Sequence, residues 1–184
     1  AHLTLALIYD RLGRTAAAGL HYREASELAP NDGPTQNAFA VHLCQQGDFS
    51  AADRHFRRAM DDAFYSTPEL AYGNAGACAR RAGNRSEAEQ YLRQALELDP
   101  NYPDALFQLA ELKLQEGDAF RARAFLQRLE SVTSADPAAL VLGYNIERQL
   151  NNFEQAESYA ARLEQLFPES NQARELRGLR QNDD

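Results

Sequence analysis

The chain has 184 residues, of which 44% are hydrophobic and 25% are charged, with a formal net charge of −8 and a pI near 5.0. Because nucleic-acid-binding proteins normally carry a basic surface that releases counterions from phosphates, this acidic balance argues against a nucleic-acid partner. No stretch approaches the roughly 18 apolar residues of a membrane span. The abundant residue types are helix formers such as Ala, Leu, Glu and Arg, so we predict an all-α fold.

Turn residues recur at spacings of 34, 36, 34 and 34 residues, namely Gly13, Gly47, Gly83, Gly117 and Asn151. Five residues after each turn stands an alanine: Ala18, Ala52, Ala88, Ala122 and Ala156. Three units close on a proline, namely Pro30, Pro100 and Pro168. Glycine permits the positive φ that ends a first helix, alanine lets a second helix approach it closely, and proline stops that second helix.

A helix-turn-helix unit of 34 residues with these positions resembles the tetratricopeptide repeat. The resemblance covers nearly the whole chain and implies a right-handed superhelical solenoid of about five repeats that forms one domain over residues 1–184. In chain order we expect repeats at 1–32, 33–66, 69–102, 103–136 and 137–168, followed by a C-terminal capping helix at 169–179.

The connection between the second and third repeats, "DDAFYSTPE", is two residues longer than the others and lacks a closing proline at position 64. Its aromatic residues, Phe64 and Tyr65, either fill the gap between stacked repeats or form an exposed aromatic contact. We expect this insertion edge to be part of the surface that meets a partner.

No catalytic chemistry is indicated. The four histidines, His2, His21, His42 and His55, are scattered, and the sequence has no HExxH, CxxC, glycine-rich phosphate loop or GxSxG motif. His21 and His55 occupy the same repeat position, which predicts outward-facing helix residues. We therefore expect no catalytic residues, no metal site and no cofactor.

The first helix of each tetratricopeptide repeat lines the concave face of the solenoid, which such proteins use for binding. The expected groove positions are Asn37, Val41, Asn74, Phe107, Glu111 and Asn145. Asparagine side chains can hydrogen-bond a peptide backbone, and the apolar residues can anchor side chains, so this surface suits a protein segment as ligand.

Cys44 and Cys78 both fall late in the first helices of adjacent repeats. Neighbouring first helices run side by side, so the spacing permits a disulfide. Two small buried thiols are the alternative, because free cysteines are commonly buried.

Two irregular segments narrow the resemblance. The run "NAFAVHLCQQGDFSAADRHFRRAMDDAFYSTPELAYGNAGACARRAG" and the run "ALVLGYNIERQLNNFEQAESYAARLEQLFPES" resemble the type IV pilus biogenesis and stability lipoproteins, the PilF/PilW family. The resemblance implies a periplasmic protein on the inner face of the outer membrane, held there by a lipidated cysteine upstream of Ala1. Its expected partner is the pilus secretin or another pilus-assembly protein, and its expected role is pilotin-like, in secretin localisation and multimerisation or in pilus stability. Some members carry a cysteine pair at these positions, so the resemblance also implies a Cys44–Cys78 bridge, which an oxidising periplasm permits.

The alternative function is that of a cytoplasmic tetratricopeptide-repeat adaptor of another complex. The two hypotheses differ in compartment, so a leader with a lipidated cysteine favours the first and reduced thiols favour the second.

Overall fold

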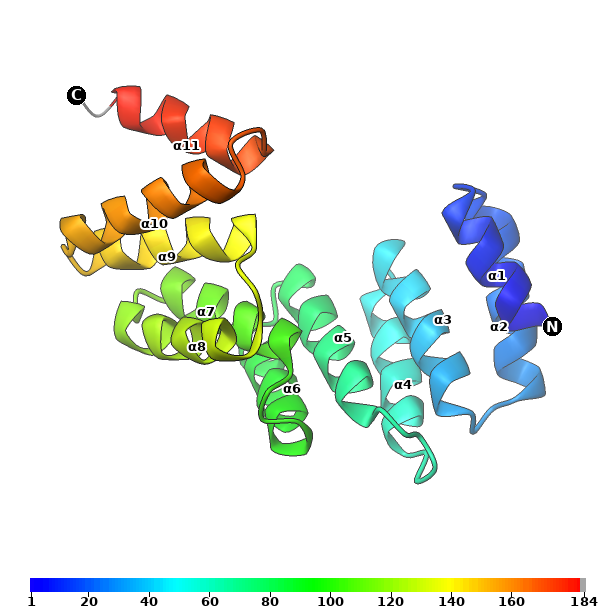
Figure 1. Ribbon diagram of the computed structural model, residues 1–184. Coiled ribbons are helices and arrows are strands. Elements are labelled where there is room, and N and C mark those ends of the chain that lie inside the picture. Colours follow the sequence, from blue (N-terminus) through cyan, green and yellow to red (C-terminus); the bar gives the residue numbers. More distant parts are fainter. Residues whose placement is uncertain (183–184) are drawn as a thin grey trace. The chain divides into compact units, whose positions relative to one another are not determined.

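The computed structural model describes residues 1–182, and all regular secondary structure within them is α-helical (Figure 1), which confirms the all-α prediction. The described helices are α1 His2–Arg11, α2 Thr15–Leu28, α3 Gly33–Gln45, α4 Phe49–Met60, α5 Pro68–Arg81, α6 Arg85–Leu98, α7 Pro103–Gln115, α8 Ala119–Val132, α9 Pro137–Gln149, α10 Phe153–Leu166 and α11 Asn171–Asn182.

Consecutive helices form helix-turn-helix pairs, from α1 with α2 to α9 with α10, as the repeat predicts. Each predicted repeat range contains one such pair, although α5 begins at Pro68, one residue before the expected start of the third repeat. The last described helix, α11, covers most of the predicted cap but begins at Asn171 and runs beyond residue 179.

The turns inside the pairs have the left-handed backbone that the sequence predicts. The φ angle is 68° at Gly13, 82° at Gly47, 83° at Gly83 and 84° at Gly117, and Asn151 takes the same conformation with a φ of 60°. Asparagine adopts this region more readily than other residues with a side chain, which explains how it replaces glycine in the fifth turn.

Aspartates begin several helices. Asp32 caps α3 by accepting the Thr35 N–H at 3.0 Å, and Asp48, Asp118 and Asp136 do the same for α4, α8 and α9. Such a cap satisfies a backbone donor that has no partner within the helix. The helix starts are therefore decided locally.

Small residues bring the paired helices together. The alanines of the repeat pattern, Ala18, Ala52, Ala88, Ala122 and Ala156, are all fully buried. In the second and third repeats they join a core cluster with Phe56 and Tyr91. The positions that set the sequence period are thus the positions where one helix lies against the next.

The chain divides into two compact units, residues 1–105 and the residues from Leu106 onward. In the first unit α3 packs against α4 and α5, and α5 packs against α6. In the second unit α9 packs against α8, α10 and α11. The right-handed superhelix and the single domain over the whole chain stay predictions.

None of the described helices is long and apolar enough to cross a membrane.

Candidate protein-binding site

Two of the predicted groove residues meet in the first unit. Asn37 on α3 and Asn74 on α5 lie on adjacent first helices, and the Asn74 Nδ2 donates to the Asn37 Oδ1 at 3.1 Å. The Asn37 Nδ2 in turn donates to the phenol oxygen of Tyr65 at 3.2 Å. These contacts order three polar side chains in a row, and we call them the amide row.

The amide row retains hydrogen-bonding capacity. A side-chain amide has two N–H donors and one carbonyl with two lone pairs. Among the described residues, the row engages one N–H of each asparagine and the carbonyl of Asn37, which leaves a second N–H on each amide and the carbonyl of Asn74. Both side chains are half-buried, so these groups are positioned to meet a peptide backbone.

The two aromatic residues of the insertion edge have different surroundings, and only Tyr65 belongs to the amide row. Tyr65 is only 9% exposed and lies against Gly33, where a built Cβ would stand 2.8 Å from its ring. Phe64, by contrast, is 97% exposed. Each of the two alternatives for this edge thus holds for one residue. Tyr65 fills the space beside α3, and Phe64 faces solvent.

The other predicted groove residues are placed as follows. Val41 lies one turn after Asn37 on α3, half-buried against the core cluster of the first unit. Phe107 and Glu111 are half-buried on α7, and Asn145 is exposed on α9, all three in the second unit. The structure thus joins Asn37 and Asn74 directly, and the use of all six residues as one groove stays a prediction.

Cys44 and Cys78 form a disulfide between α3 and α5, with their Cα atoms 5.8 Å apart. It links the same two helices that carry Asn37 and Asn74. Both cysteines are buried in the core cluster of the first unit, so the bond ties α3 to α5 inside that core.

A buried polar network in the first unit was missed by the sequence analysis. Gln36 is fully buried; its Nε2 donates to the carbonyls of Ser26 and Ala29, and its Oε1 accepts from the Ser26 hydroxyl. The His55 Nδ1 lies 2.6 Å from the same Oε1. The prediction that His55 faces outward is wrong, because its ring is half-buried against Phe39 and bound to Gln36.

His21 also differs from its predicted outward orientation. Its ring is half-buried, stacks on Tyr9 and lies beside His2, with the two Nδ1 atoms 3.1 Å apart. The alternation of polar and apolar residues could not reveal this, since a histidine fits either face of a helix.

Several tyrosines on the second helices bond to carboxylates. The phenol of Tyr91 donates to Asp53 at 2.6 Å, and burial together with this bond raises the pKa of Tyr91 far above its usual value. Burial alone would raise the pKa of Asp53, but the hydrogen bonds from Arg57 and Tyr91 outweigh it and lower that pKa. Such pairs tie neighbouring helices together, and the phenol and carboxylate oxygens that form them are engaged within the protein.

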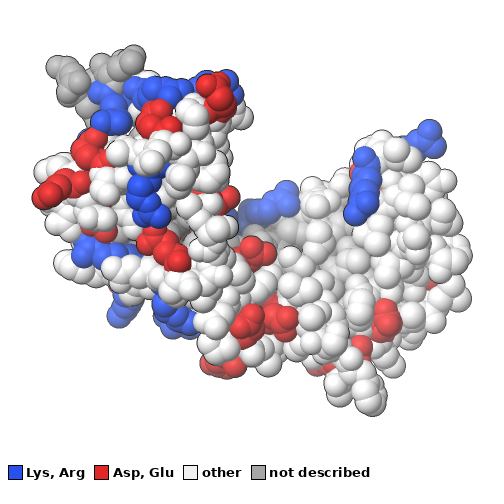
Figure 2. Space-filling model, viewed as in Figure 1, with Lys and Arg blue, Asp and Glu red and all other residues white. Residues whose placement is uncertain are grey.

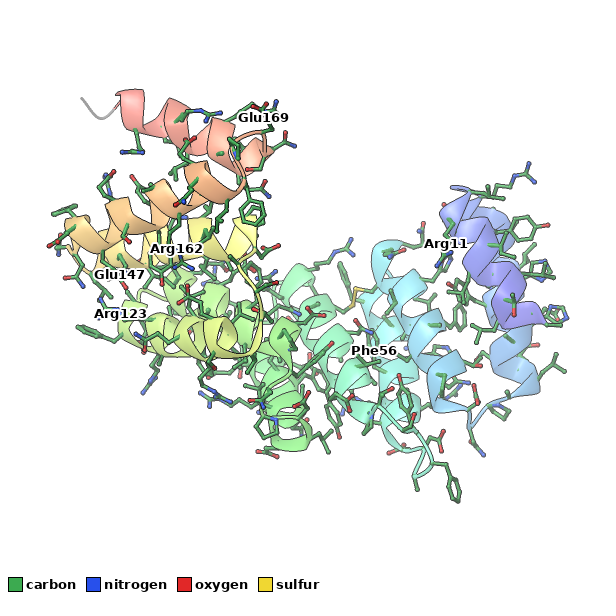
Figure 3. All side chains as sticks on the ribbon, viewed as in Figure 1. Arg11, Phe56, Arg123, Glu147, Arg162 and Glu169 are labelled. Carbon is green, nitrogen blue, oxygen red and sulfur yellow. A yellow bond between two sulfur atoms is a disulfide. The ribbon has the colours of Figure 1, made fainter. Side chains whose placement is uncertain are left out.

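A hollow of about 650 Å³ lies between α4, α5 and α6, with Asp53, Glu87 and Tyr91 in its wall. Arg57 pairs with Asp53 at 2.8 Å and with Glu87 at 3.3 Å, so both carboxylates in the wall of the hollow have a basic partner. In the second unit the buried carboxylate of Glu147 pairs with Arg123 at 2.7 Å (Figure 3). Among residues 1–182, no group of three His, Cys, Asp or Glu side chains is arranged to hold a metal ion.

Comparison with known sequences identifies the repeat. Models of the tetratricopeptide repeat match residues 1–32 and 79–143. A stretch of 88 residues, 48% of the chain, is 33% identical to cellulose synthase operon protein C of Pseudomonas fluorescens (strain SBW25). That stretch spans only 7% of the length of this curated relative.

Several solved structures are similar to almost the whole chain. The crystal structure of PilW, described as a widely conserved type IV pilus biogenesis factor, is 29% identical, with a TM-score of 0.87 over 95% of this chain and 80% of that one. PilF of Pseudomonas aeruginosa is 20% identical, with a TM-score of 0.56 over 96% and 95% of the two chains. MamA is 16% identical, with a TM-score of 0.74 over 89% and 88%. The last two likenesses, at this level of identity, concern the fold alone.

Proposed function

Since this chain belongs to the tetratricopeptide-repeat proteins, we propose that it is a non-catalytic scaffold of type IV pilus biogenesis with a pilotin-like role. The observation that carries the proposal is the likeness to PilW, which extends over 95% of this chain at 29% identity. The partner is the pilus secretin or another pilus-assembly protein, and the role is secretin localisation and multimerisation or pilus stability.

The binding chemistry proposed for the first unit is that of a peptide backbone. The amide row offers N–H donors and a carbonyl from Asn37 and Asn74, which are held in place by Tyr65. An ordered row of amides loses little side-chain entropy when it binds, so it can read an extended or helical segment at low cost. The half-buried Val41 supplies apolar contact beside it.

The Cys44–Cys78 disulfide supports a periplasmic location, because structural disulfides persist in oxidising compartments. In the proposed arrangement a lipid anchor upstream of Ala1 holds the protein on the inner face of the outer membrane. The same disulfide disfavours the alternative, a cytoplasmic adaptor, since cytosolic thiols are normally kept reduced.

Deletion of the gene in its own organism tests the proposed function. We expect heat- and detergent-resistant secretin multimers to disappear from the outer membrane while secretin monomer accumulates. Normal multimers with missing or unstable pili would place the role in pilus stability. Normal multimers together with normal pili would refute a function in pilus biogenesis.

Variants of the amide row test the surface. We expect Asn37→Ala combined with Asn74→Ala to lower the yield of multimers or pili, because the row loses its backbone-binding groups. The matched control is Asn31→Ala with Asn101→Ala, which removes two exposed asparagines from turns of the same unit. If cells that carry either double variant assemble pili equally well, and circular dichroism shows that both variants are folded, the amide row is the wrong surface. Adding Phe107→Ala then asks whether the second unit takes part.

A further inference from the structure

Phe64 is unusually exposed for an aromatic residue. Its side chain is 97% exposed, whereas Phe120, the next most exposed phenylalanine among the described residues, is 74% exposed and lies on a helix. Single apolar residues on a surface are ordinary, so exposure alone carries no function. The way the backbone of Phe64 is held does distinguish it.

The loop that bears Phe64 is tied down on both sides of it. The Asp62 carboxylate accepts the Gly33 N–H at 2.8 Å and the Phe64 N–H at 2.9 Å, and the Asp62 carbonyl accepts the Tyr65 N–H at 3.1 Å. The next side chain, Tyr65, is buried against Gly33 and bonded to Asn37. The fold therefore fixes the backbone of a residue whose ring it does not use.

An exposed aromatic ring on an ordered loop is well suited to binding. An aromatic side chain can bury 150–250 Å² or so, and aromatic residues are enriched among the residues that carry most of an interface's binding energy. Because the loop is already ordered, little backbone entropy is lost when the ring enters a pocket. The ring thus has the properties of an interface anchor.

The charge around the loop indicates what surrounds such a pocket. From Ala59 to Ala79 the sequence contains Asp61, Asp62 and Glu69 and no Lys, Arg or His. On the face seen in Figure 2, red atoms and no blue ones lie around the base of the projecting loop between α4 and α5. An acidic setting favours a partner with a basic rim and is repelled by an anionic lipid surface.

We propose that Phe64 anchors this protein in an apolar pocket, rimmed by Lys or Arg, on a pilus-assembly protein. The inference rests on the proposed function and adds the contact residue and the chemistry of the partner surface. The site is distinct from the amide row, since the row takes a peptide backbone and Phe64 enters a pocket of the partner.

The test replaces Phe64 in the organism and measures resistant secretin multimers and surface pili at equal protein levels. We expect Phe64→Ala to lower the amount of resistant multimers or of surface pili, whichever is lost on deletion of the gene, by at least about tenfold, as loss of an interface anchor does. Phe64→Trp should restore most of it because the aromatic ring is kept, and Asp61→Lys should lower it because the charge is reversed. The matched control, Phe120→Ala, should leave assembly unchanged. The melting temperature of Phe64→Ala should equal that of the wild type, since the ring packs on nothing that folding buries.

The outcomes separate this inference from the proposed function. If deletion of the gene impairs assembly but Phe64→Ala does not, the proposed function stands and the anchor is refuted. If deletion itself has no effect, both fail. Co-sedimentation with phosphatidylethanolamine–phosphatidylglycerol vesicles checks the other kind of surface. Vesicle binding by the wild type that Phe64→Ala abolishes would overturn the protein pocket in favour of a membrane contact.

Discussion

Gln36 joins three helices of the first unit through a single buried amide. It bonds the end of α2 through Ser26 and Ala29, lies itself on α3, and accepts from His55 on α4. Because the Nε2 of Gln36 already donates to two carbonyls, its Oε1 faces His55 and can only accept. The Nδ1 of His55 must therefore carry the proton in this bond.

Burial lowers the pKa of His55, and the nearby charges of Arg58 and Arg54 lower it further. The unfolded chain, with a pKa near the ordinary 6.5, takes up a proton before the folded chain does. The stability that His55 contributes should thus be fully present above pH 6.5 and be lost as the pH drops from there toward the lower folded pKa. When urea unfolding is measured between pH 8 and pH 5, the free energy of unfolding of His55→Gln should fall less than that of the wild type.

The control for this prediction is His21→Gln, which removes the histidine at the same repeat position one unit earlier. The His21 ring stacks on Tyr9, whereas His55 is bonded to the buried amide of Gln36. If His21→Gln and His55→Gln give the same pH profile, burial of His55 does not contribute to the pH dependence.

At the scale of elements, α5 and α6 approach so closely that one position admits only glycine. A Cβ built on Gly76 would stand 2.7 Å from the Leu92 Cγ and 3.3 Å from the Ala88 carbonyl oxygen. We expect Gly76→Ala to force these helices apart and to lower the free energy of unfolding by about 1–3 kcal/mol, as overpacking does.

Gly178→Ala on α11 is the matched control, because a Cβ at that position meets nothing within 4 Å. It should leave stability unchanged or raise it by up to about 1 kcal/mol, since alanine is the better helix former. Both values follow from urea unfolding monitored by circular dichroism. Equal effects of the two substitutions would show that α5 and α6 can separate without cost.

At the scale of the whole molecule, stability is distributed between units. The Cys44–Cys78 bond, with a sequence separation of 34 residues, closes a loop within residues 1–105. The chain-entropy account gives a crosslink of this length about 3–4 kcal/mol. In repeat proteins each unit is stabilised mainly by itself and its neighbours, so the effect should stay near the bond.

We therefore expect reduction of the disulfide to increase amide hydrogen exchange in α3 and α5 and to leave α9 and α10 close to their original protection. Hydrogen exchange with mass spectrometry, with and without a reductant, measures this. The variant Cys44→Ser with Cys78→Ser should resemble the reduced protein and should not respond to the reductant. An unchanged melting temperature on reduction would contradict the stabilising role of the bond.

The sequence by itself determined the helices and their pairing. The recurrence of Gly47, Ala52 and their counterparts predicted each turn and each close helix contact, because positive φ and a lack of side-chain volume are requirements of single positions. Even Asn151 could be recognised as a turn residue, since its place in the period was known. The family followed from the same local pattern.

Only the tertiary structure decided how particular side chains share space between helices. It paired Asn37 with Asn74, buried Tyr65 while exposing Phe64, and turned His55 inward onto Gln36. Periodicity assigns a residue to a face of its own helix, but a hydrogen bond or a buried ring depends on which neighbour that face meets. Asn37 and Asn74 are 37 residues apart, and they meet because α3 and α5 pack side by side.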